Sequence, residues 1–182
     1  MKDMEIPPII KIFLLPAIIV VVFLGLYNVL NNIAANQENM VSSWGQVENK
    51  LQLRFDLVSR LVNTLGDSAL QEKDLLEDIT NSTSEWNNAH TTKSKLEAAN
   101  KMDALLSRLL TMVEKYPDLK ANPDFLRVQG ELSEAENAIS VDREGYNGAV
   151  KRYNALVRNL PGNIIAPLFG YKPETEYRKS QE

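Results

Sequence analysis

The sequence predicts an all-α protein, in which an N-terminal transmembrane helix continues into an antiparallel four-helix up-and-down bundle with long first and fourth helices. Three observations predict this class. One long apolar run lies near the N-terminus. After it, apolar residues recur at spacings of three and four, which is the period of an amphipathic helix. Turn-forming or polar residues interrupt that pattern at short intervals, and short connections favour antiparallel neighbours.

The apolar run covers residues 12–30, and among its 19 positions only Asn28 is polar. An α-helix crosses the hydrocarbon core of a bilayer in about 20 residues. Pro16 lies in the first turns, where a missing N–H costs least, and Tyr27 lies near the far end, where aromatic rings favour the interface. A cleaved signal peptide is the alternative, but its apolar core is shorter, about 7–15 residues. We therefore predict a retained transmembrane helix over residues 12–32.

The distribution of basic residues predicts the orientation of this helix. Lys2 and Lys11 precede the run, whereas the 20 residues after it contain only Lys50. Because cytoplasmic flanks carry an excess of Lys and Arg, the pattern favours a cytoplasmic N-terminus and an external bundle.

The first helix is predicted to continue out of the membrane to about residue 65. Its seam of apolar residues has a heptad-like spacing and consists of Trp44, Val47, Leu51, Val58, Leu61 and Leu65. Arg54, between Leu51 and Val58, occupies a seam position at which the spacing predicts an apolar residue. Residues 66–68 (Gly-Asp-Ser) predict the end of this helix, and Ser68 with Gln71 has capping-box spacing for the next one.

Two shorter amphipathic helices are predicted next. The second would carry Leu70, Leu75, Leu76, Ile79 and Trp86. A polar stretch at residues 87–92 suits a connection. The third would carry Leu96, Ala99, Met102, Leu106, Leu109, Val113 and Tyr116. We expect Pro117 to end it.

The fourth helix has the clearest start signal in the chain. Asn122 is a favourable N-cap, Pro123 suits the first helical position, and Asp124 suits the positive end of the helix dipole. Its apolar stripe comprises Phe125, Val128, Leu132, Ala135, Ile139, Tyr146, Ala149, Tyr153, Leu156 and Leu160, with Asp142 in the same rhythm. Residues 161–162 (Pro-Gly) end it, which predicts a helix on the order of 57 Å long.

These elements divide the chain into four parts. Residues 1–11 form a short N-terminal tail and residues 12–32 the transmembrane helix. Residues 33–162 form the four-helix bundle. Residues 163–182 form an apolar membrane-proximal segment followed by a polar C-terminal tail.

Composition excludes several classes of function. The net charge is −4 and the Lys and Arg residues are scattered, which argues against nucleic-acid binding. The chain has no Cys and a single His, His90, so thiolate sites and the usual transition-metal sites are not expected. His90 lies in a polar connection without a partner at a mechanistic spacing. We expect no catalytic residue, no metal and no cofactor.

Arg54 and Asp142 are candidates for a buried polar layer, because both lie on otherwise apolar seams. A charge inside a bundle is costly unless it is paired. One interpretation is an internal ion pair that also involves Glu134, Glu136 or Arg143. Two alternatives remain: side chains that reach water along their aliphatic stems, or a ligand site. If the pair exists, Arg54 depends on an acidic partner in the fourth helix.

The dipeptides Tyr146-Asn147 and Tyr153-Asn154 form a repeat that spans one heptad. Both tyrosines fall on the buried stripe, so we expect core packing with a partner for each hydroxyl. The two asparagines fall beside the stripe and could pair with a neighbouring helix or another subunit.

The segment after the fourth helix contains an apolar group, Ile164, Ile165, Leu168, Phe169 and Tyr171. Three short reversals make the fourth helix run back toward the membrane, so its end should arrive near the bilayer. With Lys172 just after it, the group suits a contact at the membrane interface. The alternative is that these side chains fold back and cap the lower end of the bundle.

Four motifs in order resemble those of the LemA family. They are residues 115–122 (KYPDLKAN) followed by Phe125, residues 131–137 (ELSEAEN), residues 143–154 (REGYNGAVKRYN) and residues 161–171 (PGNIIAPLFGY). The resemblance extends from the anchor to about Pro173, nearly the whole chain. It implies a membrane-anchored helical bundle of a bacterial protein and supplies no activity.

One stretch departs from that pattern. The family usually has "RRxDLIPNLV" in the first soluble helix, and this chain has LRFDLVSRLV at residues 53–62. Ser59 and Arg60 replace Pro-Asn, so any proline kink found in other members should be absent.

Together these observations favour a non-enzymatic scaffold in the bacterial cell membrane, with a single transmembrane pass. Its partners would be the lipid bilayer and other membrane or envelope proteins, with a homo-oligomer as a further option. The alternative is a sensory or ligand-binding bundle at the membrane surface. A stoichiometric protein that co-purifies would favour the scaffold, and a retained small molecule would favour the sensor.

Overall fold

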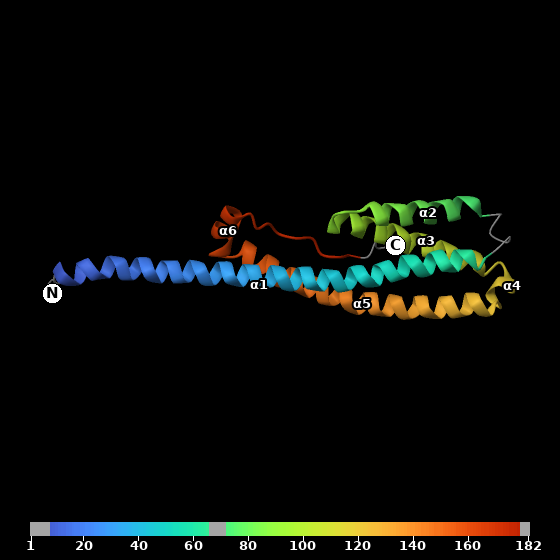
Figure 1. The fold of residues 1–182 in the computed structure, drawn as a ribbon, viewed down its shortest axis with the longest axis horizontal. Coiled ribbons are helices and arrows are strands. Elements are labelled where there is room, and N and C mark those ends of the chain that lie inside the picture. The colour runs from blue at the N-terminus through green and yellow to red at the C-terminus, as the bar shows by residue number, and fades with distance from the viewer. Residues whose placement is uncertain (1–7, 66–71, 179–182) are drawn as a thin grey trace. The chain divides into compact units, whose positions relative to one another are not determined.

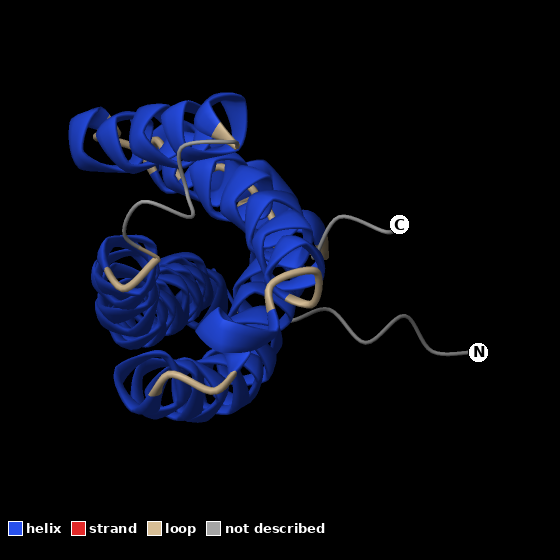
Figure 2. Cartoon of the chain, turned by 90° about the vertical axis from the view of Figure 1, so that its right-hand side faces the viewer, coloured by secondary structure: helices blue, strands red, loops and turns tan. Residues whose placement is uncertain are grey.

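A computed structural model describes residues 8–65 and 72–178 of the chain, with the side chains described from residue 14 onward. Every regular element in these ranges is helical, as Figures 1 and 2 show, which confirms the all-α class. The elements are α1 (Pro8–Asn63), α2 (Lys73–Asn88), α3 (Thr92–Val113), α4 (Pro117–Lys120), α5 (Pro123–Arg158), α6 (Gly162–Ile165) and the 3-10 helix η2 (Ala166–Phe169).

The chain forms two compact units. The first unit contains Met1–Val41 and Ala149–Glu174, and the second contains Ser42–Gly148 and Thr175–Glu182. The long helices α1 and α5 therefore each contribute to both units.

Helix α1 runs without a break from the apolar run into the second unit. Pro16 lies within its third turn and has no N–H to donate to the carbonyl four residues earlier, yet the helix continues past it. The amide of Asn28 donates a hydrogen bond to the carbonyl of Leu24 (2.8 Å), so this polar side chain is satisfied within its own helix. Among the described residues, α1 is the one helix long and apolar enough to cross a membrane, with a mean hydropathy of 2.2 over its most apolar 18 residues.

The core of the second unit contains most of the predicted seams. Buried residues of α1, of the turn after it and of α5 include Val47, Leu51, Val58, Leu61, Leu65, Phe125, Val128, Leu132, Ala135 and Ile139. Phe55 and Leu57 of α1 are also buried, although the predicted seam left them out. Phe55 stacks on Trp86 of α2 with ring centroids 4.8 Å apart, so α2 packs against α1. Helices α2 and α3 pack against each other.

Two helix starts are fixed by side-chain caps. Asn122 caps α5, because its Oδ1 accepts hydrogen bonds from the backbone N–H groups of Asp124 (2.9 Å) and Phe125 (3.4 Å), as predicted. Thr91 and Ser94 form a reciprocal capping box at the start of α3 that the sequence analysis did not identify. The capping box expected at Ser68 and Gln71 lies outside the described residues.

The prolines and glycines mark the remaining boundaries. Helix α3 ends at Val113, and Pro117 begins the short helix α4 after it. Helix α5 ends at Arg158, so Leu160 lies beyond the helix and not on its seam. Gly162 approaches the last turns of α5 so closely that a Cβ there would collide with the carbonyl of Leu156. Gly170 ends η2 with a φ of 81°, a conformation that L side chains rarely adopt.

Candidate functional site

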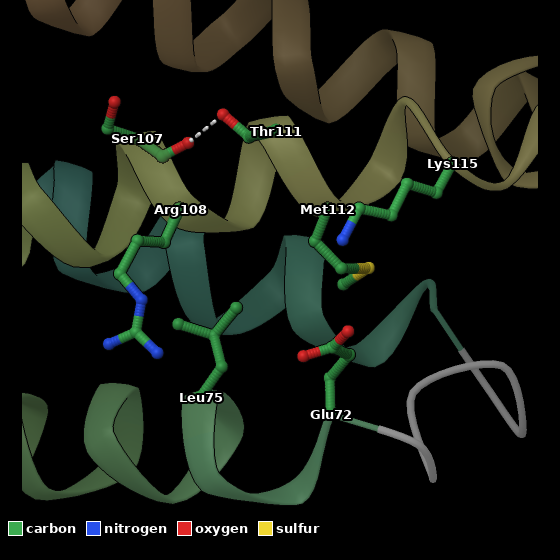
Figure 3. Close-up of a pocket in the computed structure, with 7 residues that line it drawn as sticks. All are labelled: Glu72, Leu75, Ser107, Arg108, Thr111, Met112 and Lys115. Atoms are coloured by element: carbon green, nitrogen blue, oxygen red, sulfur yellow. Dashed lines mark hydrogen bonds between the residues drawn. The ribbon is translucent and has the colours of Figure 1, made fainter.

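Three features of the structure are candidates for function: an exposed apolar surface in the first unit, a buried charged cluster in the second, and a C-terminal segment held along α5. A fourth, a shallow pocket between α2 and α3, is lined by Glu72, Leu75, Ser107, Arg108, Thr111, Met112 and Lys115 (Figure 3). Two of its polar side chains are engaged with other protein atoms, since Arg108 pairs with Asp78 and the Thr111 hydroxyl donates to the carbonyl of Ser107.

The exposed apolar surface begins on α1. Its large apolar side chains are exposed throughout the stretch from Leu14 to Leu26, and Tyr27 is exposed as well. At the other end of the chain, Leu160, Ile164, Leu168 and Phe169 are between 61% and 78% exposed, and we call these four residues the apolar patch.

The two parts of this surface belong to the same unit and lie near each other. Ile33 of α1 is fully buried, and a Cβ placed on Gly162 would lie 3.8 Å from its Cδ1. Ile33 lies three residues after the apolar run of α1, so the turn at Gly162 lies beside the end of that run.

The predicted apolar group is divided by the structure. Ile164, Leu168 and Phe169 are exposed, whereas Ile165 is buried and Tyr171 is half-buried. Ile164 and Ile165 are consecutive residues of α6, whereas Leu168 and Phe169 lie in η2, and successive residues of a helix point in different directions. One face of the segment therefore packs inward and the other is exposed.

The buried charged cluster centres on Arg54, which is 1% exposed. Its Nη1 forms ion pairs with Asp103 of α3 and with Glu136 of α5 (3.3 Å to Oε1), and its Nη2 donates to the carbonyl of Ala99 (2.9 Å). A guanidinium presents several donors in a fixed plane, so one side chain can hold three helices in register.

The cluster matches the predicted polar layer only in part. Glu136 lies in the fourth long helix, as expected for a partner of Arg54. Glu134 is exposed, and Asp142 is partly exposed and is not an ion-pair partner of Arg54. Arg143 lies with its guanidinium 5.7 Å from the ring centroid of Tyr177. Asp142 follows the spacing of the apolar stripe along α5. The α5 residue that contacts Arg54 is nevertheless Glu136.

Sequence reasoning missed Asp103, although a signal was present. Asp103 comes four residues after Ala99 and three before Leu106, both of which are buried. Such spacing places it on the apolar stripe of α3, where an acid needs a cation.

A second group of contacts surrounds Trp86 in the same unit. Its Nε1 donates to Oε1 of Gln52 (2.7 Å), and the ammonium of Lys95 lies 4.4 Å from its ring centroid. Lys95 also pairs with Glu48 at 2.6 Å. These contacts join α1, α2 and α3 through one aromatic ring, and every polar group in them is engaged.

The C-terminal segment, residues 171–178, has no regular secondary structure and is held by the two Tyr-Asn dipeptides of α5. In the first unit, the Tyr153 hydroxyl donates to the carbonyl of Lys172 (3.0 Å). The Asn154 amide donates to the carbonyl of Glu174 and accepts from its N–H, both at 2.8 Å.

The second unit repeats this arrangement. The Tyr146 hydroxyl donates to the carbonyl of Thr175 (3.1 Å), and the Asn147 amide donates to the carbonyl of Tyr177 (2.9 Å) and accepts from its N–H (2.7 Å). Both tyrosines are buried with a hydroxyl partner, as expected. The two asparagines pair with backbone groups of Glu174 and Tyr177, which lie in the part of the chain that was predicted only as a polar tail.

Tyr177 is the anchor of this segment and is 2% exposed. Burial raises the pKa of its hydroxyl to about 12, and the nearby Arg54 guanidinium opposes part of that increase. Asp103, Arg143 and Glu136 also act on this hydroxyl, which places Tyr177 beside the Arg54 cluster.

Comparison with known proteins gives two kinds of match. A model described as the LemA family matches residues 43–182. The chain is 34% identical over 67 residues to magnetosome protein MamQ 2 of Paramagnetospirillum magneticum, covering 37% of this chain and 25% of that protein. It is 24% identical over 137 residues to protein LemA of Metamycoplasma hominis, covering 75% of this chain and 63% of that protein. The chain thus spans about a quarter of the length of the MamQ relatives that it matches.

Proposed function

Since this chain belongs to the LemA family, we propose that it is a membrane-anchored helical scaffold that holds other proteins, or further copies of itself, at a membrane surface. In this proposal, α1 is the membrane anchor. The second unit is an up-and-down four-helix bundle built from α2, α3 and parts of α1 and α5.

The contacts within the second unit support the bundle. Arg54 connects α1 to α3 and α5, and the stacking of Phe55 on Trp86 connects α1 to α2. Arg60 of α1 and Glu131 of α5 add a more exposed pair at 3.2 Å. Each of the four helices thus has at least one specific side-chain contact with another of the four.

The observation that carries the proposal is the exposed apolar surface of the first unit. A fully buried Leu, Ile or Phe side chain is stabilised by roughly 1.5–3 kcal/mol relative to water. If the apolar run of α1 and the apolar patch were in water, the free energy of burying these side chains would be lost. In a lipid environment it is regained. A large exposed apolar patch is typical of a membrane or protein contact.

The apolar patch extends this contact beyond the anchor. Its four residues follow one another closely at the end of α5, and the turn at Gly162 lies beside Ile33 of α1. Lys172 follows the patch and is exposed, which suits a basic group at the level of lipid phosphates. We therefore propose that the patch lies in the membrane interface. A cytoplasmic N-terminus and an external bundle in a bacterial cell membrane follow from the positions of Lys2 and Lys11.

We propose that the protein has no catalytic activity of its own. Nη1 and Nη2 of Arg54 are engaged with Asp103, Glu136 and the carbonyl of Ala99, its buried Nε has no hydrogen-bond partner among the described residues, and Tyr177 packs beside the cluster. Such a network fixes the register of the helices.

Lipid-quenching of single labels tests the membrane contact. The chain has no Cys, so one introduced at position 168 or 169 carries a polarity-sensitive fluorophore at a single site. In liposomes, we expect quenchers on the lipid chains to reduce this fluorescence. A label at Leu126, an exposed leucine at the start of α5, is the matched control and should respond to aqueous quenchers only. Labels at 168 and 169 that respond only to aqueous quenchers, or to neither kind, would contradict the proposal.

A sensory bundle is the second candidate, and the feature that favours it is the buried Arg54 cluster beside Tyr177, where the Nε of Arg54 has no hydrogen-bond partner within the part of the chain that the structure describes. Purification of the full-length protein from membranes separates the two functions. A stoichiometric protein partner supports the scaffold, whereas a retained small molecule lost on Arg54→Leu supports the sensor.

A further inference from the structure

The two Tyr-Asn dipeptides of α5 are spaced to hold an extended chain. They are seven residues apart on the helix, which corresponds to about 10.5 Å. Their partners, Glu174 and Tyr177 for the asparagines and Lys172 and Thr175 for the tyrosines, are three residues apart. Three residues cover about 10 Å only when the chain is nearly fully extended. The repeat is therefore matched to an extended segment, and a helical or folded segment would not satisfy it.

This recognition is directed at the main chain. All six hydrogen bonds between the four α5 side chains and the segment involve its backbone: the side chains donate four to carbonyl groups, and the asparagine oxygens accept two from N–H groups. Each asparagine engages both the N–H and the carbonyl of one residue, as a neighbouring strand in a β-sheet would. Contacts of this kind fix the position of a segment but select little for its side chains.

Tyr177 provides the selectivity. Within residues 171–178 it is the one buried side chain, and it lies beneath the guanidinium of Arg143 and beside the Arg54 cluster. A flat ring suits the face of a guanidinium through a cation–π contact. The site therefore accepts an extended segment that carries an aromatic side chain at one defined position.

The segment has little else to hold it in place. Residues 172–175 and Arg178 are exposed, and no helix or strand of its own stabilises the segment. Elements with few buried contacts open at a lower free energy than the rest of a fold. When the segment opens, the site and the segment are both free on the same molecule.

A second copy of this chain presents the same segment with the same complementarity. Exchange of identical segments replaces each contact by its equivalent, so the concentration of neighbouring copies decides between the closed and the exchanged forms. Attachment to one membrane raises that concentration, as tethering does in general.

We propose that the site formed by Tyr146, Asn147 and Arg143 receives the C-terminal segment of a second copy, with that copy's Tyr177 as the anchor, and that this exchange links neighbouring molecules. The proposal rests on the proposed membrane-anchored scaffold and names its partner as the chain itself. Exchange places Tyr177 of one copy beside Arg54 of the next, so each linked site contains residues of both molecules.

Photo-cross-linking between isotopically distinct copies tests the exchange. Full-length protein with p-benzoylphenylalanine at position 177 is mixed with ¹⁵N-labelled wild-type protein in vesicles of phosphatidylethanolamine and phosphatidylglycerol. We expect cross-links from position 177 to ¹⁵N peptides of α5, and their fraction should rise with the protein-to-lipid ratio. Cross-links confined to single copies at every ratio would overturn the proposal.

Two asparagine variants of the ¹⁵N acceptor provide the matched comparison. Asn147→Ala removes the amide that holds the main chain of the acceptor's own residue 177, so that segment opens more readily and the inter-copy signal should appear roughly tenfold faster after mixing, the effect of one or two hydrogen bonds. Asn137→Ala changes an exposed asparagine of the same helix and should leave the signal unchanged. Equal rates of appearance with both acceptors would mean random collision and would also overturn the exchange.

The unmodified chain gives a second readout if the bulky side chain at position 177 is not accommodated. Lys172 of the segment and Lys151 of α5 are both exposed, and an amine-reactive cross-linker can join them. Pairs that mix ¹⁴N and ¹⁵N peptides support exchange, and pairs of one isotope only contradict it. A negative result here, together with lipid quenching at Leu168, would leave the membrane scaffold in place and remove only the exchange.

Discussion

In the first unit, Phe23 of α1 and Leu168 beyond α5 are exposed, whereas in the second unit the guanidinium of Arg54 is buried among Asp103, Glu136 and the carbonyl of Ala99. Exposed apolar side chains are unfavourable in water, and a buried cation is unfavourable in an apolar environment without partners. Exposed apolar side chains are stable where lipid removes them from water, and a buried cation is stable where carboxylates and a carbonyl pair with it. The two units therefore differ in what stabilises them: in the proposed function lipid covers the exposed apolar side chains of the first, whereas protein groups pair with the buried cation of the second.

The largest expected effect comes from placing a charge on the apolar seam of the second unit. Leu132→Asp or Ile139→Asp buries an unpaired carboxylate, and we expect a loss of about 3–5 kcal/mol in the free energy of unfolding. Urea denaturation of the full-length protein in detergent measures it. Leu126→Asp, at a half-exposed leucine of the same helix, is the control and should unfold like wild type. A wild-type midpoint for either seam variant would show that the seam is assigned to the wrong residues.

The Arg54 cluster gives the second largest expected effect, because each of its buried charges is stable only while its partner is present. Arg54→Leu leaves Asp103 without its cation and should cost about 3 kcal/mol. Arg54→Leu combined with Asp103→Leu should recover much of that loss, since neither charge then remains unpaired. Combination with Asp142→Leu should recover none. Additive losses in the Asp103 double variant would exclude coupling between the two side chains.

The pH dependence of stability depends on Tyr177. Its pKa is raised from 10.0 to about 12 in the folded state, so the folded protein retains a proton that the unfolded chain releases. The protonated Tyr177 hydroxyl therefore contributes about 2–3 kcal/mol to the free energy of unfolding. This stabilisation is fully present below pH 10 and is lost as the pH rises from about 10 to 12. Thermal melts across this range should show the decline, and Tyr177→Phe should remove that part of it. An unchanged slope in the Phe variant would mean that other groups cause the decline.

The smallest effect is expected where one hydrogen-bonding side chain holds the C-terminal segment. Asn147→Ala removes two hydrogen bonds to Tyr177 and should cost about 1–2 kcal/mol. Hydrogen exchange should locate the change in residues 175–178 and the α5 turn beside them. Asn137→Ala, at an exposed asparagine of α5, should change neither stability nor exchange. Faster exchange spread over the whole second unit would mean that Asn147 supports the bundle and not the segment.

The comparison of the two units also separates what was predictable from what was not. The apolar run of α1, the cap at Asn122 and the buried stripe of α5 were all predicted, because each depends on residues within a few turns of one another. The burial of Arg54 was predictable for the same reason, since it occupies a position that its own helix directs inward.

The choice of partner was decided by tertiary structure. Arg54 contacts Asp103, which is 49 residues away in the sequence, and nothing local distinguishes that acid from Asp142. The division of the apolar group after α5, with Ile165 inward and Leu168 outward, depends on the single turn of α6 and its contact with α1.

The asparagines of the Tyr-Asn repeat show most clearly which contacts could not be predicted from the sequence. Their seven-residue spacing was visible in the sequence, and it indicated a partner beside the buried stripe. That the partner is the extended segment ending near Tyr177 became evident only in the folded chain. Hydrogen bonds to backbone atoms leave no pattern of side chains by which the bonded segment could be recognised in advance. Periodicity within a helix determines which face is buried, whereas the packing of distant segments determines what that face contacts.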